Sequence, residues 1–420
     1  MKRIFYILIF ILISQSPVFS EDVILLEENV VHEEEIKQDE GLVPDDSVLE
    51  VDTPHEEIIE TREIPDLSKP PEFETPTFKD RISKGINDVY KLQIENTRVP
   101  SVLLKDKLTF NFEKGPVESV HIWTGLKMNM SEDIQENGDN NTTFRMGVIN
   151  NFIDGKFRGG KENFRIMLDT TPQNDRPFMQ HLFQDLYIDT KRIPHHRILV
   201  GNSPTSVGYE GAGSAYTLPF ANRSQIARNF GTVRKLGVRV MGNYDFVDYD
   251  LGGFSSGTYF SDFFPGGEFD GWVNIKPLAK TNGKYGILKI GGGIATGKRD
   301  SIGFTVTSAY VGYEYKKFRI KGEFANANGS NGLSGLTNKH RQGWTVTAYY
   351  LINKKLEAIV RYDEFDPDKS IDNNNRREYT AGLSWYIKGQ ALKLILNYVF
   401  CQNQSAKDSH RIILGAQIAL

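Results

Sequence analysis

Cysteine is nearly absent from this 420-residue sequence, since Cys401 is the only one, and no disulfide can form within a single chain. Beyond the first twenty residues, no stretch approaches about 18 consecutive apolar residues, which excludes a membrane-spanning helix. The mean hydropathy of −0.40 agrees with that exclusion. A large chain with neither disulfides nor spanning helices must be stabilised by an extensive sheet or a large core.

Motifs for nucleotide binding and metal-dependent hydrolysis are also missing. The sequence has no Gly-Lys-Ser/Thr phosphate loop and no His-Glu-x-x-His zinc motif. Most of its eight histidines fall outside the predicted strands, and His121, which lies on one, is weak support for a site by itself. The sequence therefore predicts that the protein is not an enzyme and uses no cofactor or metal.

The N-terminus has the layout of a secretory signal peptide. A basic start (MKR) precedes an apolar run of ten residues, and Val18 and Ser20 suit positions −3 and −1 of a cleavage site. The apolar run is too short to cross a bilayer. We therefore predict that residues 1–20 are a signal peptide and that the mature protein is exported.

Charge divides the rest of the chain into two parts. Residues 21–63 hold 17 Asp and Glu against two basic residues, a net charge of −15. Because the whole chain carries −4 and its first twenty residues +2, residues 64–420 carry +9. Dense like charge with few aromatics favours disorder. We predict a disordered acidic, Pro-containing linker over residues 21–99, with one short helix in it, and a folded domain over residues 100–420. The linker could be a spacer, a tether or a counter-charge.

The stretch KFRIKGEF, residues 317–324, alternates apolar and charged residues with a period of two. A strand places successive side chains on opposite faces, so one face is apolar and the other charged. Similar alternation recurs from residue 105 onward, as in TTFRMGVI, where Phe144, Met146 and Val148 share a face. Turn-forming clusters such as DPDKSIDNNN and NQSAKD separate these segments. The folded domain is therefore predicted to be all-β.

Two all-β architectures fit this alternation. In a β-sandwich the apolar face meets a second sheet, whereas in a transmembrane barrel it meets lipid and the charged face lines water. Aromatic residues recur near the predicted strand ends, for example at 348–350 and 385–387, where the interface girdles of barrels need them. About 320 residues at roughly 20 for each strand and its loop predict about 16 strands. We therefore expect a transmembrane antiparallel β-barrel of about 16 strands.

At residues 105–420 the sequence resembles the phosphate-selective porin O/P family. The resemblance is carried by RILVGNSPTSVGYEG followed by TLPFANRSQIARNFGTVRKLGVRVMG, and by VRYDEFDPD with YTAGLSWYIKGQALKLILNYVF. It implies a trimeric outer-membrane barrel that passes anions by way of arginines and lysines in the lumen and on a constriction loop. The family's phosphate-binding residues do not align one by one, so the resemblance does not imply phosphate specificity.

The position of each residue along its strand, odd or even, decides which face its side chain is on. If the apolar faces meet lipid, the basic side chains on the opposite faces line the lumen. These predicted anion-pathway residues are Lys127, Arg145, Arg165, Arg239, Lys289, Arg319, Lys321, Arg361 and Lys393. The resemblance also implies a long loop that folds inward, and its predicted constriction residues are Arg223, Arg228, Arg234 and Lys235. A low-dielectric wall focuses the field of such cations and concentrates anions. Alternatives stay open, because each lumen arginine could be half of an Arg–Asp pair and the loop cations could face outward or fix the loop to the wall.

Together these features predict a passive outer-membrane channel for small anionic solutes, with phosphate as a candidate. The alternatives are a non-channel β-sandwich adhesin and a structural outer-membrane anchor. A sandwich would fold in water without detergent. We expect the partners to be outer-membrane lipid, the barrel-assembly machinery, further copies of the chain in a homotrimer and small anions, but no nucleic acid. The expected location is the outer membrane of a Gram-negative-type bacterium.

Overall fold

The computed structural model describes residues 108–135, 140–171, 182–257, 262–281, 283–353 and 355–419. The predicted signal peptide and acidic linker lie outside these residues and stay predictions. In the described ranges, no helix is long and apolar enough to cross a membrane.

Antiparallel strands make up most of the described chain. They are β1 (Thr109–Asn111), β2 (Val117–Gln135), β3 (Asn141–Phe157), β4 (Glu162–Asp169), β5 (Phe183–Thr190), β6 (His196–Pro204), β7 (Arg234–Asn243), β8 (Val247–Ser255), β9 (Gly267–Ile275), β10 (Ile287–Arg299), β11 (Ile302–Tyr315), β12 (Phe318–Gly332), β13 (Gly335–Asn353), β14 (Leu356–Asp366), β15 (Arg376–Gln390), β16 (Leu392–Asn403) and β17 (Ser409–Ala419). The described short helices are η1 (Ala215–Thr217), α5 (Gln225–Asn229) and η2 (Ala279–Thr281).

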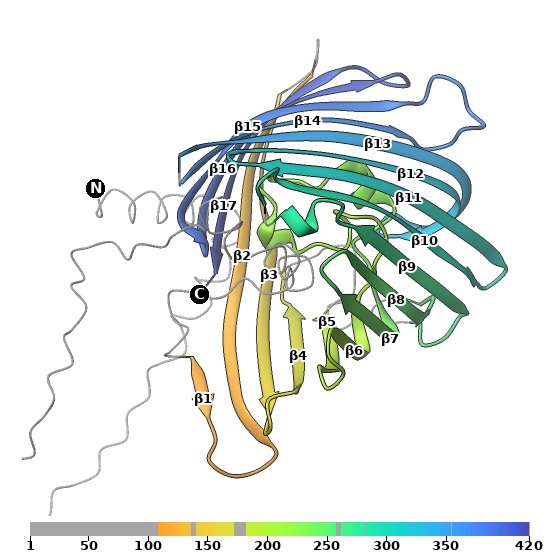
Figure 1. The fold of residues 1–420 in the computed structure, drawn as a ribbon. Helices are drawn as coiled ribbons and strands as arrows, with labels where there is room; N and C mark the ends of the chain where they lie inside the picture. Colours follow the sequence, from red (N-terminus) through yellow and green to blue (C-terminus); the bar gives the residue numbers. More distant parts are fainter. Residues whose placement is uncertain are drawn as a thin grey trace, which may run out of the picture. The chain divides into compact units, whose positions relative to one another are not determined.

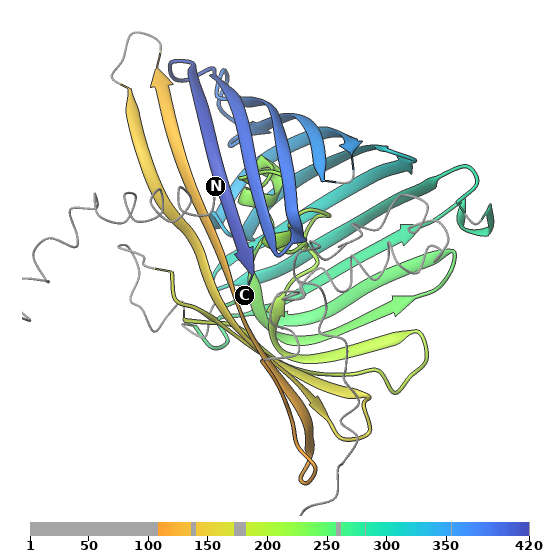
Figure 2. The same cartoon turned by 90° about the vertical axis from the view of Figure 1, so that its left-hand side faces the viewer.

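Strands β2 to β17 close into a barrel (Figures 1 and 2). Each pairs with the next strand along the chain, and the last strand, β17, pairs with β2 from Ser409 opposite Gln135 to Ala419 opposite Gly125. The three-residue β1 pairs with the first part of β2 and takes no part in the closure. The wall therefore has sixteen strands, which confirms the predicted all-β barrel of about 16 strands.

The two ends of the barrel differ in their connections. At the end where β2 begins, short turns join the strands, such as the two residues between β11 and β12. At the other end, residues 205–233 connect β6 to β7, and both views place this green segment inside the ring of strands (Figures 1 and 2). We call the two ends the turn end and the loop end, and residues 205–233 the inward loop. Short turns face the periplasm in outer-membrane barrels, and longer loops face outward.

The alternating faces point as the barrel interpretation predicts. On β12, Phe318, Ile320 and Phe324 are exposed on the outer surface, whereas Glu323 between them is buried in the interior. The other strands also alternate exposed apolar residues with buried polar ones. This is the reverse of a water-soluble protein, in which the apolar residues are inside. A closed barrel with this surface replaces the β-sandwich alternative.

One face assignment is wrong because of a β-bulge. Met128 pairs with Met146, whereas Lys127 pairs with Val148, so Gly147 is the extra residue on β3. An extra residue shifts every following side chain to the opposite face. Phe144 and Met146 therefore point outward as predicted, but Val148 points inward, where it packs against an interior aromatic cluster.

A charged side chain introduced on the outer face should lower the free energy of unfolding only where the strand faces the membrane. Val360 on β14 and Ile371 in the following loop are both 53% exposed. In lipid vesicles, Val360→Arg should lower the free energy of unfolding by about 2–4 kcal/mol if it lies near the bilayer midplane. Ile371→Arg, with equal exposure but outside a strand, should have an effect near zero. Urea titrations of both variants test this, and equal costs would argue against a lipid-facing β14.

Candidate functional site

Carboxylates and an amide of the barrel wall hold the backbone of the inward loop. Glu323 Oε1 accepts the Tyr209 N–H at 2.7 Å, and Asp363 Oδ2 accepts the Gln225 N–H at 2.8 Å. Asn397 Oδ1 accepts the Ala221 N–H at 2.9 Å. These acceptors come from β12, β14 and β16. Backbone donors buried in the lumen need such partners, so the wall fixes the loop at three separated points.

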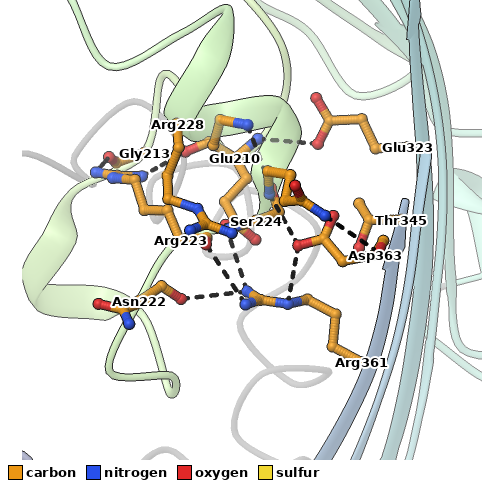
Figure 3. Close-up of polar contacts among 12 residues, drawn as sticks. Glu210, Gly213, Asn222, Arg223, Ser224, Arg228, Glu323, Thr345, Arg361 and Asp363 are labelled. Atoms are coloured by element: carbon orange, nitrogen blue, oxygen red, sulfur yellow. Dashed lines mark hydrogen bonds and ion pairs between the residues drawn. The ribbon is translucent and has the colours of Figure 1, made fainter. Parts of the chain in front are cut away.

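Glu210 connects the two limbs of the loop to the wall (Figure 3). Its Oε1 accepts the Ser224 N–H at 2.6 Å, and its Oε2 accepts from Lys321 Nζ at 2.9 Å. Arg361 Nη1 lies 4.0 Å from Oε1. Burial alone would raise the pKa of Glu210, but Lys321 and Arg361 more than offset this and lower the pKa below its ordinary value. The carboxylate is therefore ionised at neutral pH.

Apolar packing and local caps shape the loop itself. Ile226 and Phe230 pack against Phe365 of the wall, and Tyr216 packs edge-on against the stacked Trp123–Phe152 pair. The Ser224 side chain accepts the Ala227 N–H and caps the start of α5. These large, buried side chains make the loop part of the interior core.

Three cations beside the loop have backbone carbonyls as partners instead of carboxylates. Lys127 Nζ donates to Ala215 O at 3.1 Å, and Lys393 Nζ donates to Tyr216 O and Leu218 O. Arg223 donates to Glu210 O at 2.6 Å and Gly213 O at 2.5 Å. In the described part of the chain, no carboxylate lies within 4.0 Å of these three side chains. Burial lowers the pKa of Arg223 to about 10, which leaves the guanidinium charged at neutral pH.

A cavity of about 490 Å³ lies between the inward loop and strands β3 to β6. Its charged lining residues are Arg223, Arg234, Asp169 and Asp185. Arg234 Nε donates to Asp185 Oδ1 at 2.6 Å, whereas Asp169 accepts from Thr171. Among these lining residues, Arg223 is thus the cation that has no carboxylate partner in the described ranges. We call this cavity the eyelet, because the loop and the wall approach each other across it.

A second cavity of about 400 Å³ lies at the loop end, between α5 and strands β15 to β17. Its charged lining residues are Arg228, Arg376, Arg377, Lys407, Arg411 and Glu378. Three of these cations have carboxylate partners, because Arg228 pairs with Glu378, Arg377 with Glu364 and Arg411 with Asp133. Within the described residues, Arg376 and Lys407 form no ion pair. We call this cavity the basic vestibule, and Cys401 also lines it.

Most of the predicted anion-pathway residues face the interior but are neutralised there. The observed ion pairs are Arg165–Asp154, Arg239–Asp250, Lys289–Asp248, Arg319–Glu357, Lys321–Glu210 and Arg361–Asp363. Arg145 is exposed near the loop end of β3. Lys127 and Lys393 are the buried members of the set whose observed partners are backbone carbonyls and a side-chain amide, with no carboxylate partner in the described ranges. The role of all nine in anion passage remains a prediction.

The predicted constriction residues also divide into those with a carboxylate partner and one without. Arg228 pairs with Glu378 and fixes the loop to β15, whereas the pairs Arg234–Asp185 and Lys235–Glu268 join β7 to β5 and β9 within the wall. Arg234 and Lys235 are the first two residues of β7 and not part of the loop, which corrects their predicted position. Arg223 alone of the four lines the eyelet without a carboxylate partner in the described chain.

Several site residues were missed by sequence reasoning. Glu210 lies in the inward loop, where no strand pattern marks it, and Arg376 and Lys407 lie at or beyond a strand end, where the alternation carries little information. Asp185 is on β5, where the exposed Leu186 and Ile188 alternate with buried residues and could have indicated that it faces inward. The expectation that the sequence holds no Gly-x-Ser-x-Gly spacing is wrong, since residues 253–257 have it. Ser255 ends a strand there and donates to Phe263 O at 2.9 Å, whereas a nucleophile elbow joins a strand to a helix. No group of three or more His, Cys, Asp or Glu in the described ranges could hold a metal ion.

Comparison with known structures supports the fold. The anion-selective porin from Comamonas acidovorans is 14% identical, with a TM-score of 0.52, over 72% of this chain and 99% of that one. The outer-membrane channel DcaP of Acinetobacter baumannii is 11% identical, with a TM-score of 0.53, over 74% and 99%. OmpT of Vibrio cholerae is 10% identical, with a TM-score of 0.51, over 74% and 100%. At these identities the likeness concerns the fold.

Comparison at the level of sequence is more specific. No curated protein matches the chain. The family described as phosphate-selective porin O and P matches residues 295–418, which run from the end of β10 to β17. This range includes the two C-terminal motifs that carried the resemblance. The fold and the family point to a channel of the outer membrane and not to an enzyme. Residues 295–418 of the chain therefore match the phosphate-selective porin O and P family.

Proposed function

We propose that the protein is a passive pore through which small anionic solutes, with phosphate as a candidate, diffuse across the outer membrane. The observation that supports this proposal most strongly is a set of three basic side chains, Lys127, Arg223 and Lys393, that lie around one limb of the inward loop and have no carboxylate partner in the described ranges. We call them the uncompensated cations. Cations inside a low-dielectric wall raise the local potential and so the local concentration of anions. Paired cations elsewhere in the lumen contribute little to that potential, since a carboxylate cancels each of them.

Conduction also requires that no single site trap the ion. The basic vestibule at the loop end and the eyelet below it offer two positions at which an anion could pause. Several modest sites in series allow entry without preventing exit. A guanidinium such as that of Arg223 suits an oxyanion, because its planar fork donates two hydrogen bonds. We further propose that the protein is a homotrimer, as the family resemblance implies.

Ion selectivity in planar bilayers tests the proposed function. The purified protein, inserted from detergent, should form open channels without voltage or ligand, and chloride should be more permeant than potassium. A protein that forms no channels, or channels that prefer potassium, would contradict the proposal. Added phosphate that reduces the chloride current would support phosphate as a transported solute, whereas chloride current indifferent to phosphate would leave a general anion pore.

The single cysteine allows a direct test of the potential in the basic vestibule. Cys401 is partly buried and lines this cavity together with Arg376 and Lys407. An anionic thiosulfonate should modify Cys401 faster than a cationic one of similar size, because the positive potential concentrates the anionic reagent. The double variant Arg376→Gln/Lys407→Gln should reduce that rate ratio several-fold. Rates followed by mass spectrometry at low salt check this, and a ratio that salt and the variant both leave unchanged would contradict it.

A further inference from the structure

Arg223 is held in the eyelet entirely by backbone carbonyls of the loop's first limb. Its guanidinium donates to Glu210 O and Gly213 O, and Gly213 N–H also donates to Glu210 O at 3.1 Å. The turn formed by residues 210–213 is therefore the cradle of the guanidinium (Figure 3). The position of the Arg223 charge therefore depends on the position of this turn.

The position of that turn depends on the Glu210 side chain. Its carboxylate is buried and joins three separate segments, since it accepts from Ser224 N–H on the second limb and Lys321 Nζ on β12, and lies near Arg361 on β14. Arg361 in turn donates to Asn222 O and Arg223 O, which are on the second limb. One side chain thus ties both limbs of the loop to each other and to the wall. We call the Glu210, Lys321 and Arg361 side chains, together with the backbone groups that they contact, the Glu210 latch.

We propose that Glu210 is a positioning residue for ion selectivity, because its latch holds the loop closed and keeps Arg223 at the eyelet. This inference rests on the proposed anion pore and goes beyond it by naming the residue that sets the pore's width and charge position. Glu210 need not touch the permeating ion. It acts through Arg223 and through the distance between the loop and strands β3 to β6.

The direction in which the anion preference changes distinguishes a positioning role of Glu210 from a purely electrostatic one. Glu210→Gln removes a negative charge from a lumen near Lys321 and Arg361, so electrostatics alone would raise the anion preference. If Glu210 acts by position, the loosened loop widens the eyelet, and screening by water and salt weakens the field at its centre. The anion preference should then fall several-fold while the single-channel conductance rises. An increased anion preference at unchanged conductance would overturn the inference and leave Glu210 as a counter-charge.

Glu210→Asp provides a second test at constant charge. The shorter side chain keeps the carboxylate but cannot reach Ser224 and Lys321 together at their observed distances of 2.6 and 2.9 Å. Positioning predicts a higher conductance, a larger exclusion limit for neutral polymers and a reduced anion preference. A purely electrostatic role predicts no change in any of these three measurements, and that result would contradict the inference.

A matched control and the wild-type protein keep the outcomes separate. Glu268→Asp changes another buried lumen glutamate, whose hydrogen-bond partners are Lys235 and Asn331 outside the loop, and it should leave selectivity unchanged. Heat-modifiable migration in gels confirms that each variant is folded. A wild-type channel with no anion preference would refute the proposed function itself, whereas a selective wild type with unchanged Glu210 variants would refute only the role of Glu210.

The latch also has an expected pH dependence. The pKa of Glu210 is lowered in the folded protein, so its stabilising contribution is complete above the ordinary glutamate pKa and is lost only as the pH falls through the lowered value. The titration of Glu210 itself should therefore leave the selectivity unchanged between pH 8 and 5. A change in this range would come from the other charged groups packed against the latch, which are Glu323, Asp363, Lys321 and Arg361. A loss of selectivity with a midpoint near pH 6 in the wild-type channel, absent from Glu210→Gln, would contradict the assigned ionisation.

Discussion

Excision of residues 212–230 should raise the single-channel conductance several-fold and reduce the anion preference. The structure favours this deletion because the two ends of the removed segment already meet, since a Cβ atom added to Gly231 would lie 2.7 Å from the Gly211 Cα. Direct joining of Gly211 to Gly231 therefore needs little movement of the barrel. The deletion removes Arg223 and the apolar core of the loop, and it exposes Lys127 and Lys393 to lumen water.

Folding and insertion of the deletion variant need separate control. Lys127 and Lys393 lose their carbonyl partners on the loop, but water can hydrate them once the lumen is open. The sixteen wall strands keep their pairing, so the variant should still show heat-modifiable migration. An inserted variant with wild-type conductance and wild-type polymer exclusion would show that the loop is not the constriction.

Neutralising the three uncompensated cations should collapse the anion preference. In the variant Lys127→Gln/Arg223→Gln/Lys393→Gln, each glutamine retains a donor for the loop carbonyls but carries no charge. At an effective dielectric constant of about 20, one unit charge about 4 Å from an ion contributes about 4 kcal/mol before screening. Removing three such charges should bring the chloride-to-potassium permeability ratio close to unity. Zero-current potentials of the variant measure this ratio.

A control variant removes a charge pair instead. Arg239 and Asp250 form an ion pair on neighbouring strands of the lumen. Arg239→Gln/Asp250→Asn deletes one charge of each sign, so the permeability ratio should stay at the wild-type value. Equal loss of preference in both variants would mean that selectivity comes from the lumen as a whole and not from the three uncompensated cations.

The sequence was sufficient to predict the wall of the barrel because its face pattern is local. Phe318, Ile320 and Phe324 need only their own spacing to be assigned to the outer face, and the strand count follows from the length of the domain. The prediction was wrong at Val148, because the bulge at Gly147 depends on the register with β2 and not on the segment itself. A glycine between apolar residues was the signal that could have indicated it.

The interior could not be predicted to the same depth, because it depends on contacts between distant residues. The alternation placed Arg361 and Lys321 inside and brought Arg361 onto the same face as Asp363, but the pairing of Lys321 with Glu210 joins positions 111 residues apart. The alternative that loop cations fix the loop to the wall describes Arg228, whereas Arg234 and Lys235 pair with other strands of the wall and Arg223 is the residue we propose at the constriction. Contacts formed only in the folded lumen determine which cations have no carboxylate partner. The proposed function depends on those cations.

The zero-current potential of the wild-type protein in a planar bilayer across a KCl gradient tests the central claim most directly. Uncompensated Lys127, Arg223 and Lys393 at the constriction predict a potential of the sign set by chloride, larger at low salt because screening is weaker there. A potential near zero, or one of the sign set by potassium at all salt concentrations, would contradict an anion-preferring pore.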